Sequence, residues 1–485
     1  MPARTLAIAV ALCLAVALAT TLVFSDPAVS LAIFLGLLVL VVAFISTPAS
    51  LYLLVFSMLL SPEFIVSGLG SGAGAGRGLT LRFDDFLLVV IGFVWLAKRA
   101  FVKSERQLLR TPLNGPIMFY IAVCLLATLA GVLIGRVRST TGFFFVLKYY
   151  EYVFIYFMVV NVVTSRDQAK GLVRASLVTC FLIALFAISQ IPGGERASAP
   201  FEGEYGEPNT LGGYLVFMLS IVTGLLLTPG STSKRLPLFV LFVAGLVGMM
   251  ATLSRASFLA AGVVAVVATG IMTLRKPLLV PLMLLVFLSS PWWAPKTVTD
   301  RVMFTFTQEA DPAQVRVGQV RLDTSTSDRL RSWQNSFTWW KRYPILGTGV
   351  TGGPFMDAMY PRVLSETGIV GIVAFFILLG ALFRMGLMAY RKISDPFWRG
   401  VALGFILGHI GLLVHAVGAN TFLIVRIMEP FWLFAALVAR EVLAAQADEM
   451  AKDKPPTSPI FRGRGGASGT GPPWTNAGLA GQRKL

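Results

Sequence analysis

Long apolar segments separated by short polar ones run through most of this 485-residue chain. Most of them, at about 20 residues, are long enough to cross roughly 30 Å of hydrocarbon as a helix. A lipid environment requires helices here, because it offers no partners for open backbone groups. The pattern predicts an all-α, polytopic membrane bundle of about 12–14 transmembrane helices. The expected spans are residues 5–24, 29–46, 49–66, 84–98, 116–135, 141–164, 171–191, 209–228, 236–252, 256–273, 277–290, 366–384, 399–417 and 420–440.

Basic residues in the short loops indicate how these spans are oriented. Lys and Arg favour cytoplasmic loops, and with the N-terminus inside, every substantial basic loop falls on that side. The first span is interpreted as a retained helix, with a cleaved signal peptide as the alternative. The cytoplasmic basic residues are Lys98, Arg99, Lys103, Arg106, Arg110, Arg166, Lys170, Lys234, Arg235, Arg275, Lys276, Arg384, Arg391, Lys392, Lys452, Lys454, Arg462 and Arg464.

Two segments interrupt the apolar pattern and suggest the organisation of the chain. Residues 291–365 form one long, charged loop on the non-cytoplasmic side, between an N-terminal bundle at 1–290 and C-terminal helices at 366–443. Within the loop, residues 326–342 have the spacing of an amphipathic helix, capped by Ser327 or Asp328 and with arginines on its polar side. The Gly-, Pro- and Arg-rich tail at 444–485 is expected to be disordered and cytoplasmic.

Composition narrows the choice of function. The chain is 56% hydrophobic and 13% charged, and its net charge of +17 is better explained by membrane topology than by nucleic-acid binding. Cys13, Cys124 and Cys180 lie in apolar segments without metal-ligand spacing. No P-loop, dinucleotide fingerprint or metal-binding motif is present, so neither a cofactor nor a metal is expected.

The outer side nevertheless carries an excess of arginine, which opposes the usual charge bias of that side. Arginine has a planar fork of donors suited to phosphate oxygens, so an anionic partner is expected there. Arg255 is the sharpest candidate, because it lies in a turn of a few residues at the mouth of a span, where an unpaired charge is costly. The loop arginines are Arg301, Arg316, Arg321, Arg329, Arg331, Arg342 and Arg362.

Other charged or titratable residues lie inside the expected spans. Lys148 with Glu151, and Arg426 with Glu429, have i,i+3 spacing and are interpreted as self-contained ion pairs. Of the two histidines, only His415 is expected near the outer face, within reach of a site there.

Four segments in order give the chain a resemblance to the bacterial O-antigen ligase and O-antigen polymerase superfamily. They are RASAPFEGEYGEPNTLGGYL at 196–215, ATLSRASFLA at 251–260, SDRLRSWQNSFTWWKRYPILGTGV at 327–350 and LSETGIVGIVAFF at 364–376. The resemblance implies a GT-C-like membrane glycosyltransferase in the inner membrane. Such enzymes move a glycan from undecaprenyl pyrophosphate to an acceptor sugar at the periplasmic face, without metal or nucleotide sugar.

That reaction would give the outer arginines a role in binding the pyrophosphate, where negative charge develops on the leaving group. By position in the motifs, Arg255 and Arg329 are the leading candidates, followed by Arg196. Arg331, Arg362 and His415 are further candidates for substrate binding on the same side. The expected partners are membrane lipids, the lipid-linked donor, the glycan acceptor and other polysaccharide assembly proteins.

The chain departs from the family's ligases at one position. Their motif has a His seven residues before the position of Leu364, and this chain has Asp357 there. A carboxylate can still accept a proton from a sugar hydroxyl, so Asp357, Glu366 and Glu207 are the candidate bases. The departure favours a polymerase, or a related exopolysaccharide enzyme, over a ligase that transfers to the lipid A core. A flippase or transporter for lipid-linked oligosaccharide, and a non-catalytic assembly subunit, remain as alternatives.

Overall fold

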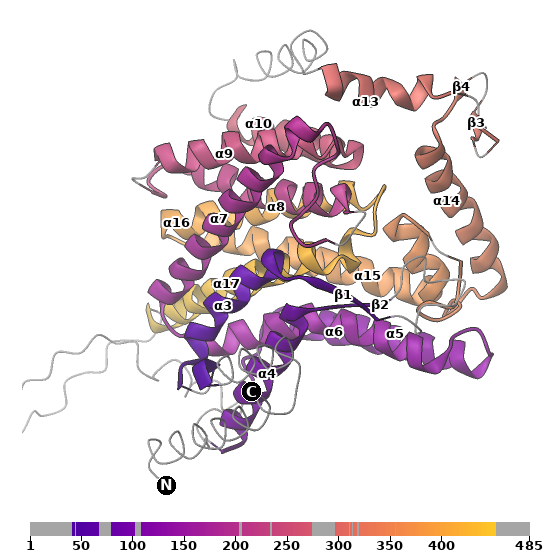
Figure 1. Ribbon diagram of the computed structural model, residues 1–485. Helices are drawn as coiled ribbons and strands as arrows, with labels where there is room; N and C mark the ends of the chain where they lie inside the picture. Colours follow the sequence, from indigo (N-terminus) through magenta and orange to yellow (C-terminus); the bar gives the residue numbers. More distant parts are fainter. Residues whose placement is uncertain are drawn as a thin grey trace, which may run out of the picture.

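In the computed structural model of this chain, apolar helices run back and forth between two ends of a bundle (Figure 1). The structure describes residues 41–43, 45–66, 79–101, 108–202, 206–232, 235–273, 296–309, 311–312, 314–317, 320–354 and 356–452. The expected spans at 5–24 and 277–290, most of 29–46 and the tail beyond 452 lie outside these residues.

Most bundle helices follow the predicted spans, but the helix at 359–392 extends beyond the expected span 366–384 at both ends. The helix at 425–452 continues past the expected end at 440, so residues 444–452 are helical where the tail was expected to be disordered. The bundle helices are α3 (Thr47–Leu60), α4 (Phe83–Phe101), α5 (Asn114–Leu133), α6 (Ser139–Val162), α7 (Arg166–Ser189), α8 (Pro208–Leu227), α9 (Arg235–Ala251), α10 (Arg255–Thr273), α15 (Met359–Lys392), α16 (Pro396–His415) and α17 (Val425–Lys452). Among the described helices, α5, α6, α7, α8, α15 and α16 are long and apolar enough to cross a membrane, and α3, α9 and α10 are shorter apolar helices. The prediction of an all-α polytopic bundle is confirmed.

Short elements complete the described chain. Two small antiparallel hairpins, which the sequence pattern did not predict, pair β1 (Glu63–Val66) with β2 (Leu79–Arg82) and β3 (Arg316–Val317) with β4 (Val320–Arg321). The remaining helices are η2 (Ile191–Gly193), α13 (Lys296–Thr307), α14 (Thr324–Arg342) and η3 (Thr421–Leu423).

Close packing of α8 against α16 forms the centre of the bundle. A Cβ atom added at Gly224 of α8 would lie only 2.2 Å from the backbone nitrogen of Gly404. Small residues at such crossings let helix backbones approach closely, which is how helices pack in a membrane. Around the crossing, Phe217, Phe405 and Phe431 pack edge-to-face or stacked, and all three are fully buried.

Polar contacts identify which helix ends lie together. At one end, Arg426 at the start of α17 donates to the carbonyl of Leu59 at the end of α3 and to that of Pro200 beyond α7. At the other end, Lys170 near the start of α7 pairs with Asp395 before α16, at 3.1 Å. The end where α3, α5, α7, α9 and α16 finish is called the α14 end below.

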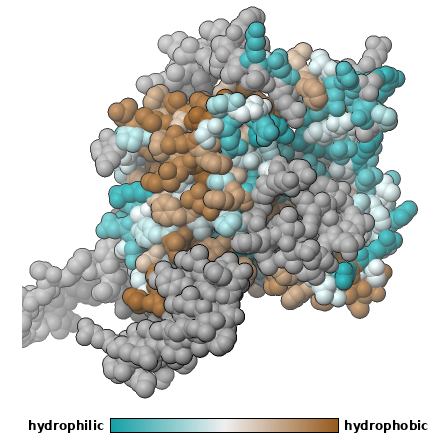
Figure 2. Space-filling view, viewed as in Figure 1, coloured by the Kyte–Doolittle hydropathy of each residue, from teal (hydrophilic) through white to brown (hydrophobic). Residues whose placement is uncertain are grey.

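Helix α14 lies across that end of the bundle (Figure 1). It packs against α15, where the Ser336 hydroxyl donates to the carbonyl of Pro361 at 2.7 Å. Its C-terminal part is held by Arg136 of the α5–α6 turn, whose guanidinium lies 5.0 Å from the ring centre of Trp339. Hydrophilic side chains gather on this side of the molecule, and apolar ones cover α7, α9 and α10 (Figure 2).

Candidate functional site

The turn between α9 and α10 presents Arg255 at the α14 end. Leu253 in this turn has a positive φ of 48°, a backbone conformation that is strained for a leucine. The turn is tied to α8 because Ser254 donates from its hydroxyl to the side-chain oxygen of Asn209 at 2.8 Å. Arg255 is therefore the first residue of α10, held at the edge of the bundle.

Arg255 forms an ion pair with Asp323, a residue that the sequence patterns did not single out. The Nη2 of Arg255 donates to Oδ2 of Asp323 at 2.5 Å, and the Asp323 side chain is only 2% exposed. Asp323 also caps α14 by accepting a hydrogen bond from the amide of Thr326. Burial alone would raise the pKa of Asp323, but the hydrogen bonds from Arg255 and Thr326 outweigh it and hold the pKa below the ordinary value.

The cap of α14 corrects one prediction. The helix begins at Thr324 with Asp323 as its cap, where Ser327 or Asp328 was expected. The reason is that the chain becomes helical one turn earlier, and Ser327 then lies buried within the helix. Its hydroxyl instead accepts from the amide of Val315 at 2.8 Å, which fastens the segment before the β3–β4 hairpin to α14.

The two candidate arginines of α14 point in different directions. Arg329 lies on the bundle-facing side of the helix, with Ser332 and Ser336. Its guanidinium packs against Gly418 in the α16–α17 connection, where a Cβ atom would lie 3.4 Å from Nε. Arg331 points outward, and its 3.6 Å contact with Asp328 joins two exposed side chains.

His415 ends α16 beside the same connection. Its ring is fully buried, and Nδ1 forms a hydrogen bond of 2.8 Å with the hydroxyl of Thr421. Within the described part of the chain, Nε2 has no hydrogen-bond partner. Arg329 is close enough to interact electrostatically with the ring. His415 of α16 and Arg329 of α14 therefore lie close together.

Arg196 and Glu207 lie in the segment that joins α7 to α8. Arg196 donates from Nε to the carbonyl of Thr252 at 3.1 Å, which brings it to the turn that carries Arg255. Glu207 accepts a hydrogen bond from the Thr210 hydroxyl at 2.9 Å and stabilises the first turn of α8. Arg196, Arg255, Arg329, His415 and Asp323 are called the arginine site below.

Asp357 lies in the segment before α15, next to the α16–α17 connection. On one side of it, the carbonyl of Met356 accepts a hydrogen bond of 2.8 Å from Asn420. On the other, the amide of Met359 donates to the carbonyl of Ala416 at 3.1 Å. The structure thus brings half-buried Asp357 close to the connection that follows His415.

Arg362 and Glu366 form an ion pair on the first part of α15. Nε of Arg362 lies 3.0 Å from Oε1 of Glu366, and both side chains are 11% exposed. The same oxygen accepts a hydrogen bond from the amide of Thr351. Glu366 is therefore engaged by α15 and by the segment that follows α14, in a cluster separate from the Arg255–Asp323 pair.

That segment and a kink in α15 explain two glycine motifs. Gly368 breaks the helical φ/ψ pattern with φ 64°, so backbone groups nearby need partners from outside the helix. The amide of Gly349 donates to the carbonyl of Glu366 at 2.8 Å, and that of Thr348 donates to Ser365 at 3.0 Å. A Cβ atom at Gly347 would lie 2.5 Å from the Glu366 backbone, so the close approach requires glycine there.

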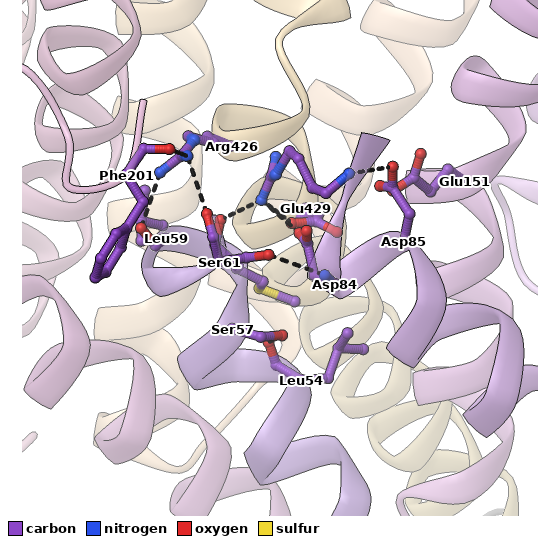
Figure 3. A network of polar contacts seen from close by, with 12 residues as sticks. Leu54, Ser57, Leu59, Ser61, Asp84, Asp85, Glu151, Phe201, Arg426 and Glu429 are labelled. Carbon is purple, nitrogen blue, oxygen red and sulfur yellow. Dashed lines mark hydrogen bonds and ion pairs between the residues drawn. The ribbon is translucent and has the colours of Figure 1, made fainter. Parts of the chain in front are cut away.

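The intramembrane ion pairs were only half predicted. Lys148 pairs with Glu151 at 3.0 Å as expected. The predicted pair of Arg426 with Glu429 is wrong: Arg426 donates to four backbone carbonyls, among them that of Phe201 (Figure 3). Glu429 instead pairs with Arg82 at 3.4 Å. The partners of Arg426 and Glu429 come from other segments of the chain, which i,i+3 spacing within one helix cannot reveal.

The described residues contain no group of three or more His, Cys, Asp or Glu side chains arranged to hold a metal ion. Cys124 and Cys180 are buried free thiols, as expected for small core residues. What the arginine site offers chemically is guanidinium donors from separate segments, with a histidine and carboxylates nearby. Such a set is suited to an anion with several oxygens, phosphate above all.

Comparison with known protein families gives a match over part of the chain. Residues 240–370 match the family model described as O-antigen ligase, and no curated protein matches the chain. The matched segment runs from α9 to the kink of α15, and it carries Arg255, Arg329, Asp357 and Glu366. The helical bundle makes the chain a multi-pass membrane protein, and the match over residues 240–370 supports its resemblance to the O-antigen ligase and polymerase superfamily.

Proposed function

We propose that this protein transfers a glycan from undecaprenyl pyrophosphate to a hydroxyl group of an acceptor sugar. The observation that carries the proposal is the meeting of Arg196, Arg255 and Arg329, from three separate segments, at one end of the bundle. The O-antigen ligase match supports a glycan ligase or polymerase and covers two of these arginines. A membrane-embedded protein with phosphate-binding groups at its rim is suited to a donor that is itself a lipid.

In the proposed reaction, the acceptor oxygen attacks the anomeric carbon of the donor glycan. The bond between that carbon and the pyrophosphate oxygen breaks, and the pyrophosphate leaves with the electron pair. Arg255 and Arg329 bind the pyrophosphate and stabilise its developing charge, with Arg196 beside them. Asp323 holds Arg255 in position, because it is hydrogen-bonded both to that guanidinium and to the start of α14. Charge stabilisation by arginines makes the reaction independent of a metal ion.

The proton of the acceptor hydroxyl goes to a carboxylate, and three are candidates. Asp357 is favoured because it lies next to the α16–α17 connection, which follows His415. Gly418 of that connection packs against Arg329. Glu366 is less suited, since one of its oxygens already accepts from Arg362 and Thr351. Glu207 holds the first turn of α8. Arg331 and Arg362 would contribute to the positive field around the donor and not contact the leaving group.

We place the reaction at the periplasmic face of the bacterial inner membrane. The support is the charge distribution: Arg99, Arg166 and Arg235 lie at the end opposite α14, the end that the positive-inside bias assigns to the cytoplasm. An aspartate at position 357, in place of the histidine of the ligases, favours elongation of a polysaccharide over transfer to a lipid core.

The test uses the purified full-length protein in nanodiscs with an undecaprenyl pyrophosphate-linked oligosaccharide. The expected result is longer glycans on a gel together with free undecaprenyl pyrophosphate, both unchanged by EDTA. Arg255→Ala should remove both products, while Arg331→Ala, an exposed arginine of the same loop, should retain them. Movement of the donor across the bilayer without a new glycosidic bond would favour a transporter instead. Loss on EDTA with recovery on magnesium would refute the metal-free mechanism.

A further inference from the structure

A second charged cluster lies at the α14 end, away from the arginine site, where α3, α4, α6 and α17 meet (Figure 3). One part of it is centred on Arg82, whose Nη2 contacts a carboxylate oxygen of Asp84 and lies 3.4 Å from Oε2 of Glu429. The Arg82 side chain is 4% exposed, and both carboxyl groups are completely buried. One cation therefore serves two acids.

The other part repeats this arrangement around a lysine. The Lys148 ammonium contacts Asp85 and lies 3.0 Å from Oε2 of Glu151, so it too is shared by two acids. These side chains are 11–15% exposed, which puts them nearer to the edge of the bundle. The two parts are joined because the backbone amide of Arg82 donates to Asp85 at 2.9 Å. The six residues Arg82, Asp84, Asp85, Lys148, Glu151 and Glu429 are called the acid corner.

The acid corner has more acids than cations. With every group ionised, four carboxylates and two cations would leave a net charge of −2 in a buried position. Isolated charges of this kind are costly inside a membrane bundle and are usually paired or neutralised. Each acid also has one buried oxygen that receives no hydrogen bond from a described donor: Oδ1 of Asp84, Oδ1 of Asp85, Oε1 of Glu151 and Oε1 of Glu429.

The nearest other charges do not supply the missing positive charge. Arg426, on the same face of α17 as Glu429, donates to backbone carbonyls and has Glu202 within 3.9 Å as its counter-charge. The described part of α3 that packs here has no charged residue and offers Ser61, which accepts from the amide of Asp84. From α6, Tyr152 lies close enough to Glu151 to interact with it electrostatically.

The acids of each part lie within hydrogen-bonding reach of each other. Asp84 is in contact with Glu429, and Asp85 with Glu151. Two ionised carboxylates only accept hydrogen bonds and repel each other, so such a contact requires a proton on one of them. Paired carboxyl groups that share one proton are known from enzyme active sites, where like charges about 3 Å apart do not both ionise.

We infer that the acid corner is a two-proton site, with one proton shared by Asp84 and Glu429 and another shared by Asp85 and Glu151. Both protons neutralise the excess charge and fill the hydrogen-bonding capacity of the unpartnered oxygens. The Lys148 part, which is nearer to the edge of the bundle, exchanges its proton first, and the more deeply buried Arg82 part exchanges later.

The bound protons connect the membrane region to the segment that carries Arg196. Arg426 and Glu429 belong to the same turn of α17, and Arg426 holds the backbone of Pro200 and Phe201, a few residues beyond Arg196. Loss of the protons at alkaline pH would leave like charges in this corner and loosen α4 and α17. The protein should therefore lose stability as the pH rises, independently of whether it transfers glycans.

The test is infrared spectroscopy of the full-length protein in nanodiscs, following the C=O stretch of protonated carboxyl groups. At neutral pH we expect a protonated-carboxyl absorption that shifts in D₂O and disappears in alkali. Glu429→Gln and Glu151→Gln should each remove part of it, because the remaining partner becomes an ordinary carboxylate beside its cation. Asp84→Asn changes the other carboxyl group of the same pair and should remove the same shared proton. It serves as the substitute variant if Glu429→Gln does not fold.

Asp395→Asn is the matched control, because Asp395 pairs one-to-one with Lys170 and should make no contribution to this absorption. Thermal unfolding provides the second readout: Glu429→Gln should melt as the wild type does at neutral pH and decline less in alkali. An absorption that is absent from the wild type, or that survives in the Glu429→Gln, Asp84→Asn and Glu151→Gln variants, would show that all four acids are ionised and would overturn the inference.

Discussion

Two clusters of charged residues lie at the α14 end of the bundle, one with more cations than acids and the other with more acids than cations. In the arginine site, cations outnumber acids, and Arg255, with a 16% exposed side chain, is placed at the rim by a short turn. In the acid corner, acids outnumber cations, and Arg82 is 4% exposed. Under the proposed function the first arrangement presents guanidinium groups to an external anion, whereas the second has to neutralise its charge internally. The difference distinguishes a site for a ligand from a site that serves the bundle itself.

The arginines of the two clusters also differ in the kind of partner that they contact. Arg82 and Arg426 are surrounded by backbone carbonyls and acids from α3, α4 and α17, as structural cations usually are. Arg255 instead pairs with the cap of α14, a loop helix that lies across the end of the bundle, and Arg329 extends from α14 to Gly418 in the α16–α17 connection. A ligand that enters between α14 and the bundle would therefore reach the arginine site and not the acid corner.

Arg255 should give the largest effect on activity, and its substitution tests the ligand-site half of this comparison. Arg255→Ala should lower the rate about 10²–10³-fold, equal to roughly 3–4 kcal/mol of transition-state stabilisation. Arg255→Lys should also be markedly impaired, since lysine keeps the charge without the planar fork. The measurement is glycan product in membranes with matched protein levels. A fully active lysine variant would mean that Arg255 only anchors the end of α10.

Arg329 and Arg331 form a matched pair within one helix, one facing the bundle and one facing outward. Arg329→Lys should lower the rate at least about tenfold, which corresponds to roughly 1.4 kcal/mol. Arg331→Lys should leave it nearly unchanged, because exposed ion pairs such as that with Asp328 contribute only about 0–1 kcal/mol. The same product assay on both variants decides the matter. Equal losses would indicate that α14 contributes through its overall charge and not through the inward arginine.

The sequence was sufficient to predict the bundle, because apolar length is a local property. The helices α5 to α10 begin and end within a few residues of the predicted spans, apart from α7, which begins five residues early. The candidate arginines were also found, since an excess of arginine on the outer side is visible in the sequence. The direction in which Arg329 points was not predicted. The bundle-facing side of α14 consists of serines, and a hydropathy pattern does not identify such a side as buried.

Long-range partners account for the rest of what sequence could not supply. Asp323 stands before a Thr-Ser-Thr run, a recognisable helix cap, but nothing local indicates that it pairs with Arg255. Arg426 and Glu429 have the spacing of an ion pair, and each nevertheless contacts residues from the N-terminal half of the chain. Sequence spacing indicates which ion pairs could form within a helix, but packing between helices determines which of them do form.

The pH dependence of Asp323 should give the smallest effect, with a sign opposite to that of the acid corner. Because the pKa of Asp323 in the folded protein lies below the ordinary aspartate value of 3.8, its pair with Arg255 stabilises the protein above that value. That contribution, about 1.5–3 kcal/mol for a hydrogen bond to a charged group, is lost as the pH falls through the lowered pKa. Asp323→Asn keeps a good helix cap and removes only the charge. Thermal unfolding of the two proteins should therefore differ at neutral pH and converge in acid, whereas the acid corner weakens only in alkali. If the two curves stayed parallel down to the lowest pH, the Arg255–Asp323 pair would contribute nothing to holding α14 against the bundle.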